Sequence, residues 1–106
     1  MDIQRLRNLT TGRLHTKIGH IYEDLEMIMG ERGLMTHMLP RVMTAVKPWL
    51  RREVRDERFW DGAYDTTHVG DYDLRMPDEG DRAAMLERYL GQPNPLEGKH
   101  VIMASL

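Results

Sequence analysis

Apolar side chains recur every three or four positions in four stretches of the chain, the spacing that is typical of amphipathic helices. These stretches span residues 3–9, 19–29, 37–58 and 82–90. Asp2 and Thr36 precede the first and the third stretch, and both belong to the residue types that cap helix N-termini. Gly30 and Gly91 follow the second and the fourth, where glycine commonly ends a helix. The pattern therefore predicts three to four helices, with the longest break between residues 58 and 82.

Two prolines shape the prediction for the third stretch. Pro40 falls in the expected first turn, where a missing backbone N–H costs little. Pro48 falls near the middle, so we expect the helix to kink or restart there. Beyond it, Trp49 and Leu50 are expected to face the interior, whereas a cluster of four arginines is expected to face water. These are Arg51, Arg52, Arg55 and Arg58.

Other segments are expected to supply short strands. They are residues 13–18, residues 64–69 or 71–76, and residues 100–106. Within the first, Leu14, Thr16 and Ile18 would share one face of the strand. The expected fold class is therefore α+β, with three to four helices packed on a short two- or three-stranded sheet.

Length and composition narrow the class of protein. At 106 residues the chain is expected to form one domain, residues 1–106, with a single small core. The absence of cysteine excludes disulfides, thiolate nucleophiles, cysteine zinc sites and iron–sulfur clusters. No apolar run approaches the roughly 20 residues of a membrane span, and the N-terminal segment lacks a signal-peptide core. We therefore expect a cytoplasmic protein that makes no membrane contact.

Methionine supplies nine of the apolar side chains. Its flexible thioether fills irregular gaps in a core, and it also adapts to the shape of a partner. Exposed methionines together with Trp49 or Trp60 would suit a contact between two copies of the chain. A homodimer is therefore compatible with the sequence.

The two halves of the chain differ in charge. Residues 1–58 hold eleven basic and eight acidic side chains, about +3, whereas residues 59–106 hold four and nine, about −5. The acidic side chains concentrate in residues 61–81, and the basic ones in the arginine cluster at 51–58. Such polarity can steer charged partners toward a surface.

No catalytic motif is visible in the sequence. His37 has no serine or cysteine nucleophile beside it in a recognisable motif, so a structural role or plain exposure is the favoured interpretation. Asp65, His68, Asp71 and Asp73 lie close in sequence, and such oxygen and imidazole groups would suit a divalent metal. A solvated acidic loop is the favoured interpretation over a metal site, and a partner-binding loop is a further alternative. We therefore expect no enzyme activity, no cofactor and no metal.

Two elements resemble a family of small uncharacterised proteins from phages and prophages. The first is Thr-Thr-Gly-Arg-Leu at 10–14, followed by a tyrosine-containing helix that ends in glycine, and the second is Thr-His-x-Leu-Pro-Arg at 36–41. The resemblance covers about the first 45 residues well and the last 30 loosely. It implies a phage context, in which small accessory proteins often bind a host factor stoichiometrically, as anti-CRISPR inhibitors of bacterial defence do.

The leading hypothesis is a non-enzymatic, phage-type protein of the bacterial host cytoplasm that inhibits a host defence protein, such as a CRISPR effector complex, by stoichiometric binding. The acidic segment would mimic the charge of a nucleic acid, and the arginine cluster would supply a second contact. The predicted contact residues are Asp61, Asp65, Asp71, Asp73, Arg51, Arg52 and Arg55.

Two alternatives from other classes stay open. A module that binds a nucleotide or another small signal would hold phosphate with Arg13, His37 and Arg41. A DNA-binding regulator would place the arginines of residues 48–58 on phosphates. Because the chain as a whole is not basic, direct nucleic-acid binding is less favoured than binding of a protein.

Overall fold

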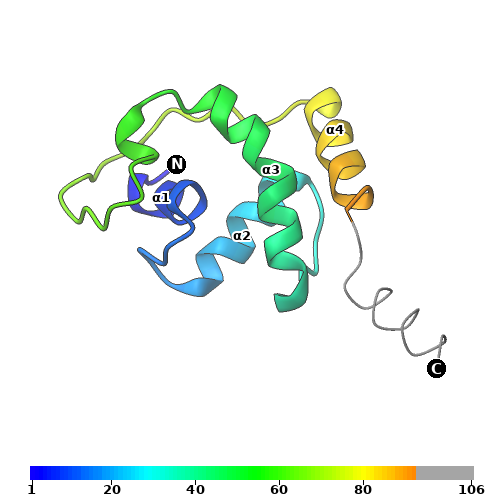
Figure 1. The fold of residues 1–106 in the computed structure, drawn as a ribbon, viewed down its shortest axis with the longest axis horizontal. Coiled ribbons are helices and arrows are strands. Elements are labelled where there is room, and N and C mark those ends of the chain that lie inside the picture. Colours follow the sequence, from blue (N-terminus) through cyan, green and yellow to red (C-terminus); the bar gives the residue numbers. More distant parts are fainter. Residues whose placement is uncertain (93–106) are drawn as a thin grey trace.

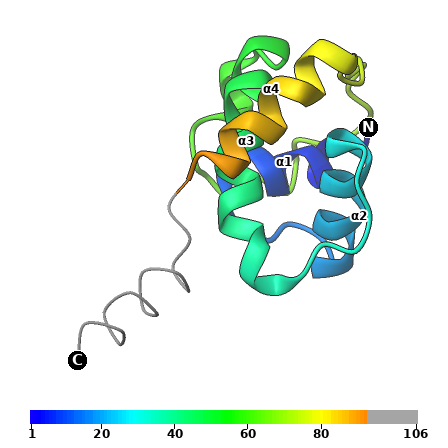
Figure 2. The ribbon, with the colours of Figure 1, turned by 90° about the vertical axis from the view of Figure 1, so that its right-hand side faces the viewer.

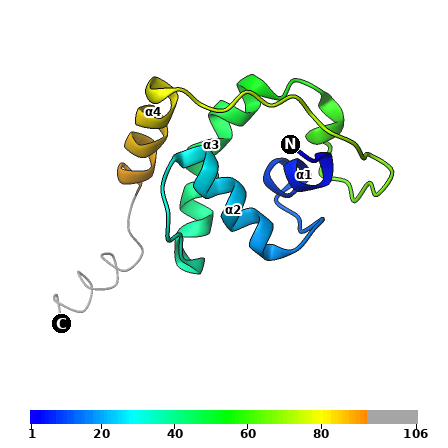
Figure 3. The same cartoon turned by 180° about the vertical axis from the view of Figure 1, so that it is seen from behind.

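Four α-helices carry the fold. The computed structural model describes residues 1–92, in which the helices are α1 (Ile3–Thr11), α2 (Ile18–Met29), α3 (Leu39–Glu53) and α4 (Glu79–Leu90). Short 3-10 turns precede and follow α3, at Thr36–Met38 (η1) and Glu57–Phe59 (η2). Figure 1 shows α1, α2 and α3 gathered together with α4 packed against α3, and the views in Figure 2 and Figure 3 agree. Within residues 1–92, none of these helices has the length and apolar character needed to cross a bilayer.

Local sequence sets the helix ends. The Asp2 side chain accepts a hydrogen bond from the amide three residues on, at 3.0 Å, and caps α1 as predicted. Gly12 and Gly30 end α1 and α2 in the left-handed conformation, with φ of 70° and 72°, which only glycine adopts without strain. At the start of α4, the Asp78 side chain accepts from the Asp81 amide at 2.8 Å, and Asp81 accepts from the Asp78 amide at 3.2 Å.

The third helix differs from its prediction at three points. Thr36 lies in η1 instead of capping α3, and its hydroxyl pairs with that of Tyr22 at 2.7 Å. Pro48 lies inside α3, which neither stops nor restarts there. Pro48 and Thr44 are both exposed, so water can reach the carbonyl that the proline leaves without a partner. The helix ends at Glu53, short of the predicted end at residue 58.

The core draws on all four helices. Trp49 and Leu50 expose only 2% and 1% of their surface, which confirms their predicted inward orientation. Val54 and Phe59 after α3, and Leu74 before α4, complete the set. The helical members are Leu6, Leu9, Leu25, Ile28, Met29, Val42, Ala45, Val46, Trp49, Leu50 and Met85.

The predicted α+β fold class is wrong, because residues 1–92 contain no β-strand and therefore no sheet. Extended backbone from the long connection before α4 meets the start of the chain in one antiparallel bridge, between Asp2 and Asp71. The Leu74 amide then donates to the Tyr72 carbonyl at 2.9 Å, a bond that closes a tight turn. This turn bends the chain away, so pairing stops after a single bridge and residues 71–76 form no strand. Residues 64–69 form none either.

The strand predicted at residues 13–18 is also wrong, because a side chain takes the backbone donors that a strand would use. Asn8, which is 1% exposed, accepts hydrogen bonds from the amides of His15 and Thr16 at 2.6 and 3.2 Å. The segment therefore turns against the end of α1, and α2 follows directly. The strand predicted at residues 100–106 lies outside the described residues.

One buried side chain organises the connection between η2 and α4. Arg7 of α1 is fully buried, and its guanidinium donates to the carbonyls of Arg58 and Ala63, both at 2.6 Å, and to Nδ1 of His68 at 2.9 Å. Because a guanidinium can only donate, Nδ1 of His68 is the acceptor in this hydrogen bond. The His68 ring packs on Phe59 with 4.6 Å between centroids. Helix α1 thus anchors a segment that has no regular structure of its own.

Candidate functional site

A groove runs along α4, between this helix and the segment that joins α2 to α3. It consists of two adjoining hollows of about 240 and 260 Å³, which share Met29, Glu31 and Leu86. We call it the α4 groove. Its other lining residues are Gly30, Arg32, Leu34, Met38, Val42, Glu79, Arg82, Ala83 and Tyr89.

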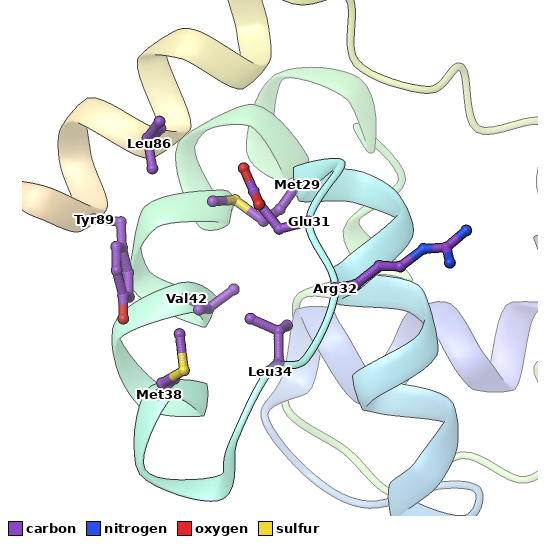
Figure 4. Close-up of a pocket in the computed structure, with 8 residues that line it drawn as sticks. All are labelled: Met29, Glu31, Arg32, Leu34, Met38, Val42, Leu86 and Tyr89. Atoms are coloured by element: carbon purple, nitrogen blue, oxygen red, sulfur yellow. The ribbon is translucent and has the colours of Figure 1, made fainter.

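The larger part of the groove surface is apolar. Met29 and Val42 form a buried floor, with 7% and 1% of their surface exposed, whereas Leu86 on the wall is 40% exposed. Figure 4 shows Leu86 and Tyr89 extending from α4 on one side, with Leu34 from the joining segment on the other. When a partner covers an exposed leucine beside two hollows, apolar surface leaves water and the free energy of the complex is lowered.

Methionine and leucine extend this apolar surface beyond the hollows. Leu90 lies one turn after Leu86 on α4 and is 68% exposed, and Met35 follows Leu34 and is 61% exposed. Met38 lines the groove itself. Flexible methionine side chains at the edge of an apolar groove can adapt to the shape of what binds there.

The joining segment is held in place although it has no regular structure. The Glu26 carboxylate of α2 accepts hydrogen bonds from the amides of Gly33 and Leu34, at 2.6 and 3.4 Å. The pair between the Tyr22 and Thr36 hydroxyls fixes the end of the segment. One wall of the groove is therefore formed before any partner arrives.

Three arginines fix the other wall by donating to carbonyls at helix ends and on α3. Arg82 donates to the carbonyls of Met27 and Ile28 at the end of α2, both at 3.1 Å. Arg88 of α4 donates to the Ala45 carbonyl of α3 at 2.8 Å. These bonds hold α4 at a set position over α2 and α3.

Arg41, at the start of α3, holds the other end of α4. Its guanidinium donates to the carbonyls of Tyr89 and Gln92 at 3.0 and 3.3 Å, and it lies 4.5 Å from the centre of the Tyr89 ring. The Gln92 side chain donates back to the Arg41 carbonyl at 2.9 Å. Arg41 therefore joins the start of α3 to the end of α4.

Two carboxylates that line the groove have no cationic partner within residues 1–92. Glu31 lies between the two hollows and Glu79 at one end, and both are exposed. Among the described residues, neither carboxylate takes part in an ion pair or a side-chain hydrogen bond. Two cations line the same hollows: Arg82 donates to backbone carbonyls and keeps its positive charge, and the Arg32 side chain extends away from Leu86 and Tyr89 in Figure 4.

Most members of the predicted arginine cluster are engaged in local contacts. Arg52 forms an ion pair with Asp81 at 2.6 Å, and this hydrogen bond holds the pKa of the Asp81 carboxyl below its usual range. Arg58 pairs with Asp56 at 2.9 Å. The Arg51 guanidinium lies 4.2 Å from the centre of the Trp60 ring. The exposed side chain of Arg55 donates to the Arg52 carbonyl at 3.3 Å.

The four predicted acidic contact residues divide into two pairs. Asp61 accepts from the Ala63 amide at 2.8 Å and lies 3.5 Å from Arg7, and Asp65 accepts from the amide and hydroxyl of Thr67, so both shape the loop. Asp71 and Asp73 are exposed. No hydrogen bond or ion pair involves either of these two side chains within residues 1–92. Their role and that of the arginine cluster in partner binding stay predictions.

The three residues predicted to hold phosphate lie on three different elements. Arg13 is exposed in the turn after α1, His37 is exposed in η1, and Arg41 joins α3 to α4. Within residues 1–92, no contact brings the three side chains to one point.

The remaining polar cluster surrounds the turn between α1 and α2. The Thr11 hydroxyl donates to the Arg7 carbonyl at 2.6 Å, so it must accept from Nε2 of His15 at 3.0 Å. The His15 ring stacks on Tyr64 with 4.6 Å between centroids, and its Nδ1 is buried without a partner among the described residues. Burial lowers the pKa of His15, and the charges of Arg7 and Arg13 lower it further. Residues 1–92 contain no group of three or more histidine and carboxylate side chains placed to hold a metal ion.

Sequence reasoning missed the α4 groove. The only local signal is the apolar width of α4, where the neighbours Met85 and Leu86 cannot both face the core. Met85 is fully buried and Leu86 is the exposed one. The rest of the groove depends on where the joining segment lies, and no periodicity indicates that.

Comparison with known protein families places the first part of the chain. The model of the family described as a domain of unknown function (DUF7736) matches residues 1–60, and the chain belongs to this family. The match includes α1, α2, α3 and η2, whereas α4 lies beyond it. No curated protein and no solved structure matches the chain.

Proposed function

We propose that this member of the family is a non-enzymatic binding protein that acts by holding a partner protein in the α4 groove. The observation that carries the proposal is the combination of a buried apolar floor and an exposed apolar wall at Leu86. Water contact at such a surface costs free energy, which a bound partner recovers.

The architecture of the groove favours a binding role. Its walls are fixed by Glu26 on one side and by Arg82, Arg88 and Arg41 on the other. A preformed site loses little conformational entropy when the partner binds, so a larger share of the contact energy appears as affinity. The methionine at position 38 adds adaptability within this rigid frame.

The proposed partner is a host defence protein, such as a CRISPR effector complex, in the bacterial cytoplasm. Support for this target comes from the resemblance of residues 10–14 and 36–41 to phage and prophage proteins. A small inhibitor of this kind would act by occupying a surface of its target, at one copy per target.

Capture from a nuclease-treated bacterial host lysate tests the function. The tagged chain is compared with Leu86→Glu, which places a charge on the groove wall, and with Val69→Glu, which changes another exposed apolar side chain outside the groove. We expect the unchanged chain and Val69→Glu to retain one host protein in stoichiometric amount, and Leu86→Glu to retain less than a tenth of it. Equal capture by all three, or no capture by the unchanged chain, would contradict the proposal.

The two alternatives receive less support. The ion pairs of Arg52 and Arg58 leave fewer arginines to hold DNA phosphates. The contacts of Arg41 with α4 leave Arg13 and His37 without the third member of their predicted phosphate site. Both alternatives stay predictions, and nucleotide-induced thermal shifts or salt-dependent DNA binding would support them.

A further inference from the structure

We propose that the α4 groove accepts an amphipathic helix of the partner, with two apolar side chains one or two turns apart and at least one lysine or arginine near them. This inference rests on the proposed function and names the chemistry of the element that enters the groove.

The shape of the groove sets the spacing of the apolar side chains. The two hollows adjoin each other at Leu86, and α4 lines them with Glu79, Arg82, Ala83, Leu86 and Tyr89, which share one face of the helix. The hollows are therefore arranged along the helix axis, where each turn advances about 5.4 Å. A second helix lying along the groove presents side chains at i and i+3, i+4 or i+7 to the same row.

The backbone of the joining segment favours a helix over an added strand. A strand that binds by edge pairing needs free amide donors on the edge it joins. The amides of Gly33 and Leu34 already donate to the Glu26 carboxylate, and the Glu31 amide donates to the Glu26 carbonyl at 3.2 Å. The bound element must therefore satisfy its own backbone, as a helix does.

The two carboxylates of the groove that are unpaired within the described residues indicate that the entering helix carries a basic residue. Glu31 stands between the hollows and Glu79 at one end, and no other residue among 1–92 pairs with their side chains. A lysine or arginine on the flank of the entering helix would neutralise one of them. An acidic helix would instead meet like charge.

A selection from a random 16-residue peptide display library tests the inference on the full chain. Enriched peptides are synthesised, and their affinities are measured for the unchanged chain, for Leu86→Glu, for Val69→Glu and for the double variant Glu31→Gln, Glu79→Gln. The charge control is the double variant Glu57→Gln, Glu87→Gln, which removes two exposed carboxylates that do not line the groove.

We expect the enriched peptides to share apolar residues at i and i+3, i+4 or i+7 together with lysine or arginine. Their affinity should fall at least tenfold with Leu86→Glu and about threefold to tenfold with the Glu31, Glu79 double variant. Val69→Glu and the charge control should leave it within twofold. The binding peptides should also gain helical circular dichroism when they bind.

Several results would overturn the inference. These are no enrichment, a consensus that is acidic or lacks helical spacing, and equal binding to Leu86→Glu. If Ile102→Asp raises the peptide affinity tenfold, residues 99–106 of the chain itself compete with the peptide, and the groove would be assigned to them. A mass of two chains in sedimentation, returned to one by Leu86→Glu, would assign it to a second copy. If the peptide selection fails but Leu86→Glu still abolishes capture from the lysate, the proposed function is supported and a helix as the bound element is excluded.

Discussion

Arg7 is a charged residue in the centre of the molecule, and it stabilises the loop rather than binding a ligand. Its guanidinium donates to the carbonyl of Arg58 in η2, and to the carbonyl of Ala63 and the imidazole of His68 in the connection that follows. The side chain of its ion-pair partner Asp61 is 48% exposed and lies 3.5 Å away. The loop therefore depends on hydrogen bonds from one side chain.

Replacing Arg7 with Met should destabilise the fold strongly. The change would remove the donor to the buried imidazole of His68 and to two part-buried carbonyls, so we expect the free energy of unfolding to fall by about 3 kcal/mol or more. Urea denaturation measures it. Arg13→Met is the control, because Arg13 is exposed, and it should cost less than about 0.5 kcal/mol. A similar small cost at both positions would contradict the role assigned to Arg7.

His15 should make the stability of the fold depend on pH. Its pKa in the folded chain lies below the ordinary value of 6.5, because burial and two arginines oppose its charge. Between these two values the unfolded chain binds a proton that the folded chain does not. The stabilising contribution is therefore present above pH 6.5 and lost as the pH falls through the lowered pKa.

Urea denaturation at several pH values between 7.5 and 5 tests this expectation. His15→Gln should make the free energy of unfolding fall less steeply toward acid than in the unchanged chain. His37→Gln, which changes an exposed histidine of η1, should keep the original slope. An unchanged slope in His15→Gln would show that another group is responsible.

At the scale of the elements, helices were predictable and strands were not. Helical stripes such as Leu6 and Leu9, or Val42 and Val46, are buried as the period of 3.6 residues requires. A short alternating segment carries less information, because alternation alone does not supply a neighbouring strand. In residues 13–18 the amides of His15 and Thr16 donate to the side chain of Asn8, a residue outside the segment, so the segment alone does not encode the outcome.

Truncation of two adjacent residues on α4 should cost very different amounts of stability. Met85 is fully buried, so Met85→Ala should lower the free energy of unfolding by about 2–5 kcal/mol. Leu86 is 40% exposed, so Leu86→Ala should cost less than about 1 kcal/mol. Thermal or urea denaturation of the two variants checks the contrast. Similar large costs at both positions would mean that Leu86 is part of the core and that the groove is not an open site.

At the scale of the whole molecule, the candidate site arises only when separate segments are brought together. The end of α2, the joining segment, the start of α3 and one face of α4 each supply a part of the α4 groove. In the sequence, each part has the pattern of an ordinary helix face or loop. The charged segments that stand out in the sequence are instead largely engaged in holding the fold, as the pairs Arg52–Asp81 and Arg58–Asp56 illustrate.

Site-specific photo-crosslinking shows directly whether the partner contacts the α4 groove. A photoreactive amino acid replaces Leu86 in the α4 groove or, in a control protein, Val69 in the connection before α4, and each tagged protein is irradiated in a bacterial host lysate. We expect a covalent adduct with one host protein from position 86 and none from position 69. An adduct from position 69 alone, or no adduct from position 86, would contradict the claim that the α4 groove is the surface that holds the partner.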